Sequence, residues 1–311
     1  MPFLAKISHG YYLFYMNVSV IIVNYNTKDL LVNCINSIYE CTHNIDIEII
    51  VVDNASVDGS NRVIKEQYSN VILLESKKNL GFGKANNLGA KIAKGKYLFF
   101  LNSDTIILNN AINLFFQFNE EKEKILQIGV TGGILVDDKI QETASFGPLP
   151  TKRGMLKFIL GLLPPFTKMT ANESRCINNN GYVEVGYVSG ADMFLSKSTF
   201  DRIGGFDSNI FMYYEETDLQ FRLKRANYCN YVIAGTQIIH LEGASFGSVK
   251  KNNIKRLMVV KSMMYYFKKH SDHISFFLFK VGFLTVRVTT MLDPSYSWRE
   301  KKEYILQIIR S

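Results

Sequence analysis

The stretch VSVIIV, residues 18–23, decides the fold of this chain. It is short, uncharged and rich in β-branched residues, which is typical of a strand buried on both faces of a parallel sheet. An amphipathic helix should follow, capped by Asn26 or Thr27, because helical spacing collects one apolar stripe of Leu30, Leu31, Cys34, Ile35 and Ile38. A strand followed by a helix is the repeating unit of α/β proteins.

The same unit recurs downstream. Apolar runs at 47–52, 71–75 and 97–101 predict three more strands, with segments of helical character between them. The pattern predicts an α/β fold with a doubly wound, mostly parallel sheet, whose ligands bind beyond the carboxyl ends of its strands. Further expected elements are a helix near 109–122, strands near 128–135, 183–188, 193–195 and 231–240, a helix from about 215, and a long connection at 137–181 with a short helix.

Composition narrows the class of protein. Of the 311 residues 47% are hydrophobic and 21% charged, which argues against disorder. The 36 Lys and Arg against 28 Asp and Glu give a formal charge of +8, which suits phosphate groups or an anionic membrane surface as partners. The most apolar long stretch, 273–292, contains Lys280 and Arg287, so we expect no membrane-spanning helix. We predict a cytoplasmic protein that lies, if it meets a membrane, at the inner face of the cell membrane.

Three parts are expected along the chain: a lead-in, a main α/β domain and a basic helical C-terminal extension, at residues 1–17, 18–247 and 248–311. The lead-in matches no pattern, and we expect translation to begin at Met16.

Polar residues follow the predicted strands, and Asn102-Ser103-Asp104 is the most informative group. A carboxylate at this edge of the sheet can hold a divalent cation and leave most coordination positions to a phosphate-bearing substrate. The same triplet is also ordinary turn and cap chemistry.

The glycine-rich stretch 79–89 suggests phosphate binding but fits neither common template. A P-loop needs Gly where Lys78 stands and Ser or Thr where Ala85 stands. A dinucleotide fingerprint should follow the first strand, and this stretch follows the third. The alternative is a tight helix start that binds no ligand.

An acid pair, Glu215-Glu216, opens the helix near 215. Glu216 shares its stripe with Leu219 and Leu223 and should point into the protein, where partial desolvation would raise its basicity. Glu215, Asp218 and Arg222 share another face, which we expect to be a solvated salt-bridge ladder. The pair suits a general base, or simply complements the helix dipole. His240, at a predicted strand end, joins the site only if these clusters share one cleft.

Taken together, these residues resemble the inverting GT-A-fold glycosyltransferases of family 2, particularly the rhamnosyltransferase-like branch. The resemblance runs from about Val18 to Ser245 in ordered blocks: VSVIIVNYN (18–26), IEIIVVDNASVDGS (47–60), NLGFGKANNLG (79–89), YLFFLNSD (97–104), VSGADMFLSKSTFDRIGGFD (188–207), FMYYEETDLQFRLKRA (211–226) and HLEGAS (240–245). It implies a donor half at about 18–135 and an acceptor half at about 183–247.

The resemblance also implies roles for individual residues. Asp53 receives the nucleobase of a nucleotide-sugar donor. Asp104 binds the cation of the diphosphate, Mg²⁺ or Mn²⁺, with His240 beside it, and the pair Glu215-Glu216 contains the base. The remaining donor-binding residues expected on this basis are Tyr25, Asn26, Asn54, Asn79, Gly81, Asn86, Asn102 and Ser103.

Two positions depart from the family pattern. The metal motif is often Asp-x-Asp, and here Asn102 replaces the first acid, so cation affinity should be weaker. The acid pair is usually Glu-Asp, and here its second member is Glu216. The base is therefore open between the two glutamates, with Glu216 preferred for its inward stripe.

The resemblance implies transfer of a sugar to an acceptor hydroxyl with inversion, in cell-surface polysaccharide or glycolipid assembly, by a hexosyl- or rhamnosyltransferase. The acceptor would be a glycan or a lipid-linked saccharide. The apolar run at 155–166 and the basic helix at 250–269 suggest peripheral contact with anionic lipid, or are ordinary packing and solvated faces.

Other classes of protein remain as alternatives at this stage. One is a nucleotide-sugar-binding protein without transfer activity, in which Asn102 and Glu216 mark lost catalysis. A nucleotidyltransferase should carry a basic, glycine-rich loop after the first strand, which VNYNTKD (23–29) lacks. Nucleic-acid binding would leave the acidic residues without a role, so we expect no nucleic-acid partner. The sequence does not set the donor sugar or base, or the oligomeric state.

Overall fold

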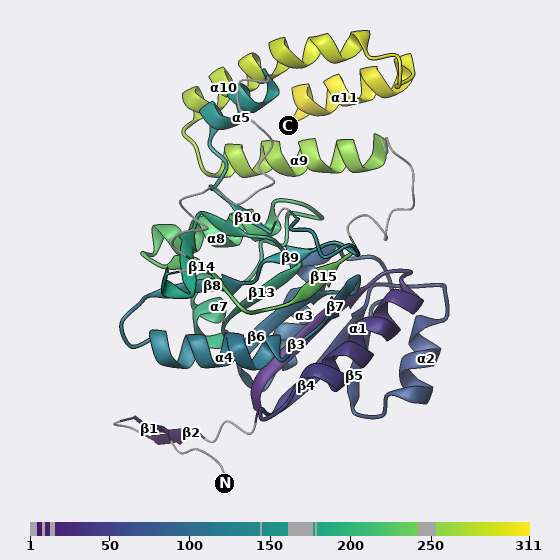
Figure 1. Ribbon diagram of the computed structural model, residues 1–311. Helices are drawn as coiled ribbons and strands as arrows, with labels where there is room; N and C mark the ends of the chain where they lie inside the picture. The colour runs from purple at the N-terminus through teal and green to yellow at the C-terminus, as the bar shows by residue number, and fades with distance from the viewer. Residues whose placement is uncertain are drawn as a thin grey trace.

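The computed structural model describes residues 5–7, 10–12, 16–143, 145–160, 177, 179–241 and 253–311. An α/β body carries a layer of C-terminal helices on one side (Figure 1). Antiparallel strands β1 (Ala5–Ile7) and β2 (Gly10–Tyr12) form a small hairpin at the opposite end, near the N-terminus.

The large sheet has the strand order β11-β14-β8-β13-β6-β3-β4-β5. Its parallel half pairs β3 (Met16–Asn24) with β4 (Ile47–Asp53) and β6 (Gly95–Asn102), and β4 with β5 (Val71–Glu75). The other half is mixed, because β13 (Asp192–Ser196) runs antiparallel to β6 and to β8 (Ile128–Gly132). The remaining strands of the sheet are β14 (Cys229–Ile233), parallel to β8, and β11 (Tyr182–Val185), antiparallel to β14.

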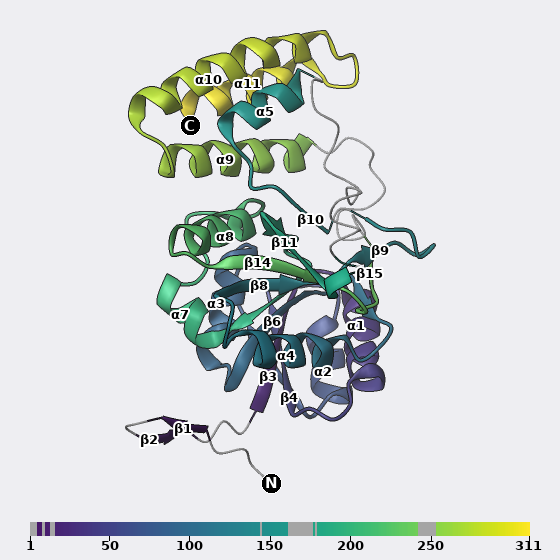
Figure 2. The same cartoon turned by 60° about the vertical axis from the view of Figure 1, so that its left-hand side comes forward.

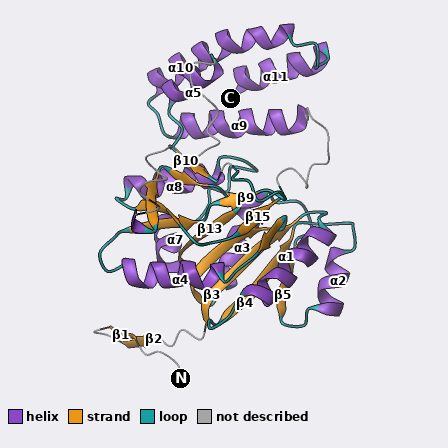
Figure 3. Cartoon of the chain, viewed as in Figure 1, coloured by secondary structure: helices purple, strands orange, loops and turns teal. Residues whose placement is uncertain are grey.

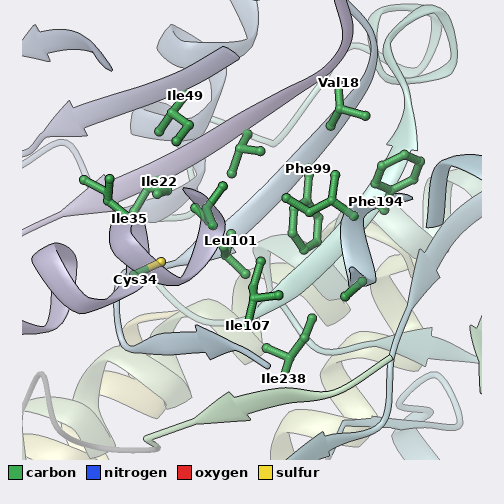
Figure 4. Close-up of a cluster of buried hydrophobic side chains, with 14 of the residues drawn as sticks. Val18, Ile22, Cys34, Ile35, Ile49, Phe99, Leu101, Ile107, Phe194 and Ile238 are labelled. Carbon is green, nitrogen blue, oxygen red and sulfur yellow. The ribbon is translucent and has the colours of Figure 1, made fainter. Parts of the chain in front are cut away.

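Helices cover both faces of this sheet, as a doubly wound fold requires (Figure 3). Alternate residues of β3 point to opposite sides: Val18, Val20 and Ile22 enter one apolar cluster, and Ile21 enters the other. The first cluster packs against α1 (Lys28–Cys41) and α4 (Ala111–Lys122), and Figure 4 shows Ile22, Cys34 and Ile35 within it. The second packs against α3 (Phe82–Ile92), α7 (Lys197–Ile203) and α8 (Glu215–Arg225).

Short strands lie beside the carboxyl ends of the parallel strands. β15 (Ile238–His240) pairs antiparallel with β7 (Thr105–Ile107) and parallel with β9 (Leu135–Val136). This pairing sets His240 opposite Thr105, beside the end of β6. Elsewhere β10 (Phe146–Gly147) pairs with β12 (Tyr187–Val188), and α2 (Ser60–Gln67) leads into β5.

The C-terminal layer contains α9 (Asn253–Lys269), α10 (His273–Arg287), the 3₁₀ turn η2 (Val288–Leu292) and α11 (Trp298–Arg310). It has its own apolar cluster, against which Met155 and Leu156 of α5 (Lys152–Ile159) and Tyr214 and Phe221 of the α/β body also pack. Figures 1 and 2 place α9 next to the body and α10 farther out. Among the described residues, no helix is both long and apolar enough to cross a membrane.

The α/β prediction and the helical, basic C-terminal part are confirmed. The predicted strands and helices of the first 122 residues match β3 to α4 closely, whereas the β1–β2 hairpin, β7, β10 and α7 were not expected. The connection at 137–181 contains the expected short helix, α5, but 161–176 lies outside the described residues. So do 242–250, which include Glu242, Gly243 and Ser245, and 251–252 at the start of the predicted basic helix. The three domain boundaries stay predictions.

Candidate active site

Asn24, the last residue of β3, is the hub of the strand-end network. Its amide nitrogen lies 2.9 Å from Asp53 Oδ1, 2.9 Å from Ser56 Oγ and 2.8 Å from Ser60 Oγ. Its amide oxygen accepts a hydrogen bond from Thr27, whose hydroxyl also lies 2.9 Å from Ser103 Oγ. The ends of β3, β4 and β6 are therefore joined in one polar network, as the carboxyl edge of a parallel sheet allows.

Asp53 is almost fully buried, with 1% of its surface exposed. Its carboxylate accepts hydrogen bonds from Asn24 and from the backbone N–H of Ser56. In the structure Asp53 thus holds the turn at 54–60, and its role toward a nucleobase stays a prediction. Tyr25, next to Asn24, has 47% of its surface exposed.

Asn54 and Asn79 shape the glycine-rich loop. The Asn54 side chain donates to Asn79 Oδ1 and accepts from the N–H of Leu80 at 2.8 Å, while Asn79 Oδ1 also accepts from the N–H of Gly81. Asn26 makes a comparable contact, accepting from the N–H of Val57 at 2.8 Å. These predicted donor-binding residues lie together and order the loops around the strand ends.

Gly81 is required by geometry. Its φ is +81°, and a Cβ built on it would lie 2.0 Å from the carbonyl oxygen of Phe211. That carbonyl accepts a hydrogen bond of 2.9 Å from the N–H of Phe82. The glycine-rich loop is thereby joined to the segment that leads into α8. Asn86, one turn into α3, is buried and bonds to the carbonyl of Phe82.

Gly81→Ala should destabilise the fold by about 2–4 kcal/mol, because the backbone must leave both its left-handed conformation and its contact with Phe211. Gly59→Ala is the matched control: its φ is +83°, but no atom lies within 4 Å of the added Cβ. It should lose only about 1–2 kcal/mol for the left-handed conformation. Urea unfolding of both variants measures the difference, and equal losses would refute the close-contact explanation.

Asp104 and His240 form the candidate metal site. His240 Nε2 lies 3.4 Å from Asp104 Oδ1, and Asn102 Nδ2 lies 3.5 Å from the same imidazole nitrogen. Two ligands on one divalent ion about 2.1 Å away stand about 3 Å apart, so this pair fits adjacent coordination positions. Within the described ranges no three His, Cys, Asp or Glu side chains gather to hold a metal. A bound ion would therefore need oxygen ligands from substrate and water.

The acid pair is presented by an unusual backbone turn. Tyr213 and Tyr214 have φ of 67° and 69°, a left-handed conformation that is rare for bulky residues and is common at functional sites. α8 begins immediately afterwards. Gln220, one turn further on, bonds to both the N–H and the carbonyl of Val188 and fixes the helix to β12.

Glu215 and Glu216 have different neighbours: Glu215 lies beside α3, and Glu216 lies beside Gly190. A Cβ built on Gly83 would lie 3.5 Å from the Cβ of Glu215, so this acid rests on the first turn of α3. A Cβ built on Gly190 would lie 3.7 Å from Glu216. The next residue, Ala191, accepts a hydrogen bond of 3.0 Å from the N–H of Asn102. The acid pair is therefore linked by short contacts to both the glycine-rich loop and the Asn102–Asp104 turn.

Burial raises the pKa of both acids. For Glu215, burial and the nearby charge of Glu216 raise the pKa well above its ordinary value. For Glu216, burial raises the pKa against the opposing hydrogen bond from Thr217. Glu215 Oε2 has no hydrogen-bond partner among the described residues. Since the two carboxyl groups share a poorly solvated space, one of them readily carries a proton.

The expected solvated ladder of Glu215, Asp218 and Arg222 is wrong. Glu215 is buried, and Asp218 has no exposed surface. Asp218 Oδ2 accepts from Arg222 at 2.8 Å, and Oδ1 lies 2.7 Å from both Lys269 Nζ and His270 Nε2. Lys269 is the last residue of α9 and His270 follows it, so helical spacing within α8 gave no sign of either.

Asp218→Asn should destabilise the protein by about 3–5 kcal/mol, because Arg222, Lys269 and His270 lose the buried carboxylate that they contact. Asp201→Asn removes the exposed partner of Lys197 and should lose less than about 1 kcal/mol of stability.

Burial alone would raise the pKa of Asp218, but hydrogen bonds from His270 and Lys269 and the charge of Arg222 bring it to about 2. This stabilisation is complete above the ordinary value of 3.8 and fades as the pH falls towards about 2. Unfolding curves across that range test both points, and an Asp218 variant as stable as Asp201→Asn would refute them.

Sequence reasoning missed Asn24 as the hub, although it stands in the polar group at the end of β3. It also missed Asp192, which is fully buried and accepts a hydrogen bond of 2.7 Å from the N–H of Gly133. Burial raises the pKa of Asp192 well above its ordinary value. Its position after Gly190-Ala191 was the available signal.

Comparison with known proteins identifies the family. The sequence model of glycosyl transferase family 2 matches residues 19–174, half of the chain. Poly(ribitol-phosphate) beta-glucosyltransferase of Bacillus spizizenii is 31% identical over 198 residues, 56% of this chain and 31% of that protein. Glycosyltransferase GlyG of Streptococcus pneumoniae is 35% identical over 115 residues, 36% of this chain and 38% of that protein. The matches thus span about a third of each of these two relatives.

A relative of more similar length is N-acetylglucosaminyl-diphospho-decaprenol L-rhamnosyltransferase of Mycobacterium tuberculosis, 25% identical over 213 residues, 65% of this chain and 68% of that protein. Among solved structures, GalNAc-T7 with UDP, GalNAc and Mn²⁺ superposes with a TM-score of 0.59 at 16% identity, over 81% of this chain and 47% of that one. That likeness concerns the fold. The chain has a GT-A fold and belongs to glycosyl transferase family 2.

Proposed function

We propose that this protein transfers a sugar from a nucleoside diphosphate-sugar to an acceptor hydroxyl with inversion at the anomeric carbon. The observation that carries the proposal is the convergence of three predicted groups on one edge of the sheet: the acid pair, the Asn102–Asp104 turn with His240, and the loop held by Asn54 and Asn79. Family membership and the glycosyltransferase names of the relatives support the reaction class.

In the proposed single displacement, the acceptor oxygen forms a bond to the anomeric carbon as the bond from that carbon to the diphosphate oxygen breaks. The acceptor proton passes to a carboxylate of the acid pair, with Glu216 our preferred base because it faces Gly190 on the side of the Asp104 turn. Its raised pKa increases its basicity. Glu215, more deeply buried, would retain its proton or share it with Glu216.

The diphosphate gains negative charge as it leaves, and positive charge nearby would stabilise it. Asp104 and His240 are the residues that would hold Mg²⁺ or Mn²⁺, and a bound ion would offset the charge that develops on the diphosphate. The Mn²⁺ in the GalNAc-T7 structure supports a divalent ion here. The network of Asn24, Asp53 and Ser103 would order the loops before the donor binds, with Tyr25 against the base.

For the acceptor we propose a glycan or a lipid-linked saccharide in cell-surface assembly, used at the cytoplasmic face of the membrane. The support is the name of the M. tuberculosis relative, which specifies a diphospho-decaprenol-linked acceptor. A rhamnosyl donor is one candidate and a hexosyl donor another, since the B. spizizenii relative is named as a glucosyltransferase.

The test is a screen of nucleotide sugars with Mn²⁺ by thermal shift, followed by detection of released nucleoside diphosphate and of the anomeric configuration of the product by NMR. A donor that raises the melting temperature and is consumed, with inverted configuration, supports the proposal. Donor binding without turnover in the presence of lipid-linked and soluble saccharide acceptors would favour the alternative, a nucleotide-sugar-binding protein. A retained configuration would refute inversion.

A further inference from the structure

α10 is apolar on two opposite faces. Its inner face contributes Phe276, Phe279 and Phe283 to the core of the C-terminal layer. Its outer side also carries large apolar side chains, Ile274, Phe277, Leu278 and Val281, and Val288 at the start of η2 continues them; these side chains are 48–74% exposed. Their spacing of three, four and seven residues places them on one stripe. A solvent-facing helix side would ordinarily be polar, so this stripe is built to contact something apolar.

The stripe lies where a flat partner can reach it. Figures 1 and 2 both show α10 in the layer farthest from the large sheet, with α9 between them. The exposed apolar surface continues past the helix to Leu292 in η2, which is 84% exposed. The surface thus extends along more than the fifteen residues of α10 itself.

Charge identifies the partner. Residues 253–311 carry eleven Lys and Arg against four Asp and Glu, whereas residues 1–252 carry 25 against 24. Almost all of the net charge of +8 is therefore concentrated in the part of the chain that contains the apolar stripe. By helical spacing Lys280 and Arg287 fall on one border between the two faces of α10. In the structure Lys280 Nζ donates to the carbonyl of Ile309 at 2.7 Å, and the Arg287 guanidinium lies over the Phe283 ring. A lipid headgroup would have to draw these long side chains away from those contacts.

We propose that the outer stripe of α10, in the strongly basic C-terminal part of the chain, docks the protein on an anionic lipid surface. An apolar face with basic borders is the pattern of a helix that lies in the membrane interface, and each Lys or Arg near an anionic leaflet adds to the attraction. A membrane partner goes beyond the proposed function. It rests on the proposed function only for the reason why the protein would need a membrane.

Docking through α10 would also present the active site to the membrane side. In Figure 1, β3 rises from the end near the hairpin toward the side on which α9 lies, so the carboxyl ends of the parallel strands face the C-terminal layer. The last residues of α9, Lys269 and His270 beside it, hold Asp218 two positions after Glu216. The docking layer is therefore bonded directly to the helix that carries the proposed base.

The test is co-sedimentation of the full chain with vesicles, without donor or acceptor. Vesicles of phosphatidylglycerol and phosphatidylcholine should bind it about tenfold or more tightly than phosphatidylcholine alone. The quadruple variant Ile274→Ser, Phe277→Ser, Leu278→Ser and Val281→Ser should lose binding about tenfold or more. The matched control is Val57→Ser with Ile125→Ser, which removes two exposed apolar side chains from the α/β body and should bind like the natural chain.

The four substituted side chains are exposed, so thermal unfolding of the quadruple variant should match that of the natural chain; if it does not fold, Phe277→Ser alone should still weaken binding. Three results would each overturn the proposal: no sedimentation with anionic vesicles, equal binding by the natural chain and the stripe variants, or a dimer in sedimentation equilibrium that the stripe substitutions dissociate. Because no sugar transfer is measured, failure here leaves the proposed function standing, and an inactive protein that binds vesicles leaves this inference standing.

Discussion

Glu216→Gln should lower turnover by about two to four orders of magnitude, the range expected when a general base is lost. The amide has nearly the same size as the acid and cannot accept the acceptor proton. Donor affinity should change little, because Glu216 rests against Gly190 rather than against the glycine-rich loop. Turnover at saturating donor and acceptor, with donor affinity from calorimetry, measures both quantities.

Glu215→Gln is the matched control, one residue away in the same helix turn. If Glu216 is the base, Glu215→Gln should retain much more activity, and the acid limb of the pH profile should stay close to that of the natural enzyme, because a Glu215 that keeps its proton carries no charge to remove. In the natural enzyme activity should rise with pH through the raised pKa of Glu216, since the base acts deprotonated. A Glu216→Gln enzyme as active as the natural one would remove Glu216 from this role, and a larger loss in Glu215→Gln would assign the base to Glu215.

Asp104→Ala should abolish the part of donor binding that depends on Mn²⁺ and reduce turnover by about two to three orders of magnitude, because several kcal/mol of charge stabilisation is lost. Asp104 supplies the single carboxylate of the candidate metal pair, as Asn102 stands where the wider family often has a second acid. Calorimetric titration of the donor with and without Mn²⁺ measures the metal-dependent part directly.

His240→Ala serves as the control for Asp104. It removes a neutral ligand but leaves the carboxylate, so metal-dependent binding should weaken without disappearing. The binding of donor without metal should be the same in both variants. Equal metal-dependent affinity in Asp104→Ala and the natural protein would show that the ion, if it binds, is held elsewhere.

The sequence predicted the parallel half of the sheet well, because β3, β4 and β6 are continuous apolar runs whose period and flanking turns are local signals. It gave no direction for β13, which runs antiparallel to β6, since strand direction depends on which neighbour a strand meets. β7 and β10 were not predicted, because strands of two or three residues are too short to show an alternation of apolar and polar residues.

The candidate site likewise has residues that local sequence signals predicted and residues that they did not. Residues at strand ends, such as Asn54, Asp104 and His240, could be found from position and from the ordered blocks of the family. The surroundings of α8 could not be predicted, because helical spacing does not show which other elements pack against each side of the helix. Glu215 is buried by α3, and Asp218 by the end of α9, about fifty residues further along the chain. Long-range contacts of this kind, not local propensity, set the charge state of the acid pair.

The proposed reaction requires the Asp104 turn and the acid pair to serve one donor site. A crystal structure with a nucleoside diphosphate and Mn²⁺, with the ion located by its anomalous scattering, tests it most directly. We expect the ion on Asp104 and the diphosphate, the nucleoside between Tyr25 and the loop of Asn79, and Glu216 facing the space where the sugar would stand. An ion or nucleotide bound away from Asp104, or one separated from Glu216 by intervening protein, would contradict it.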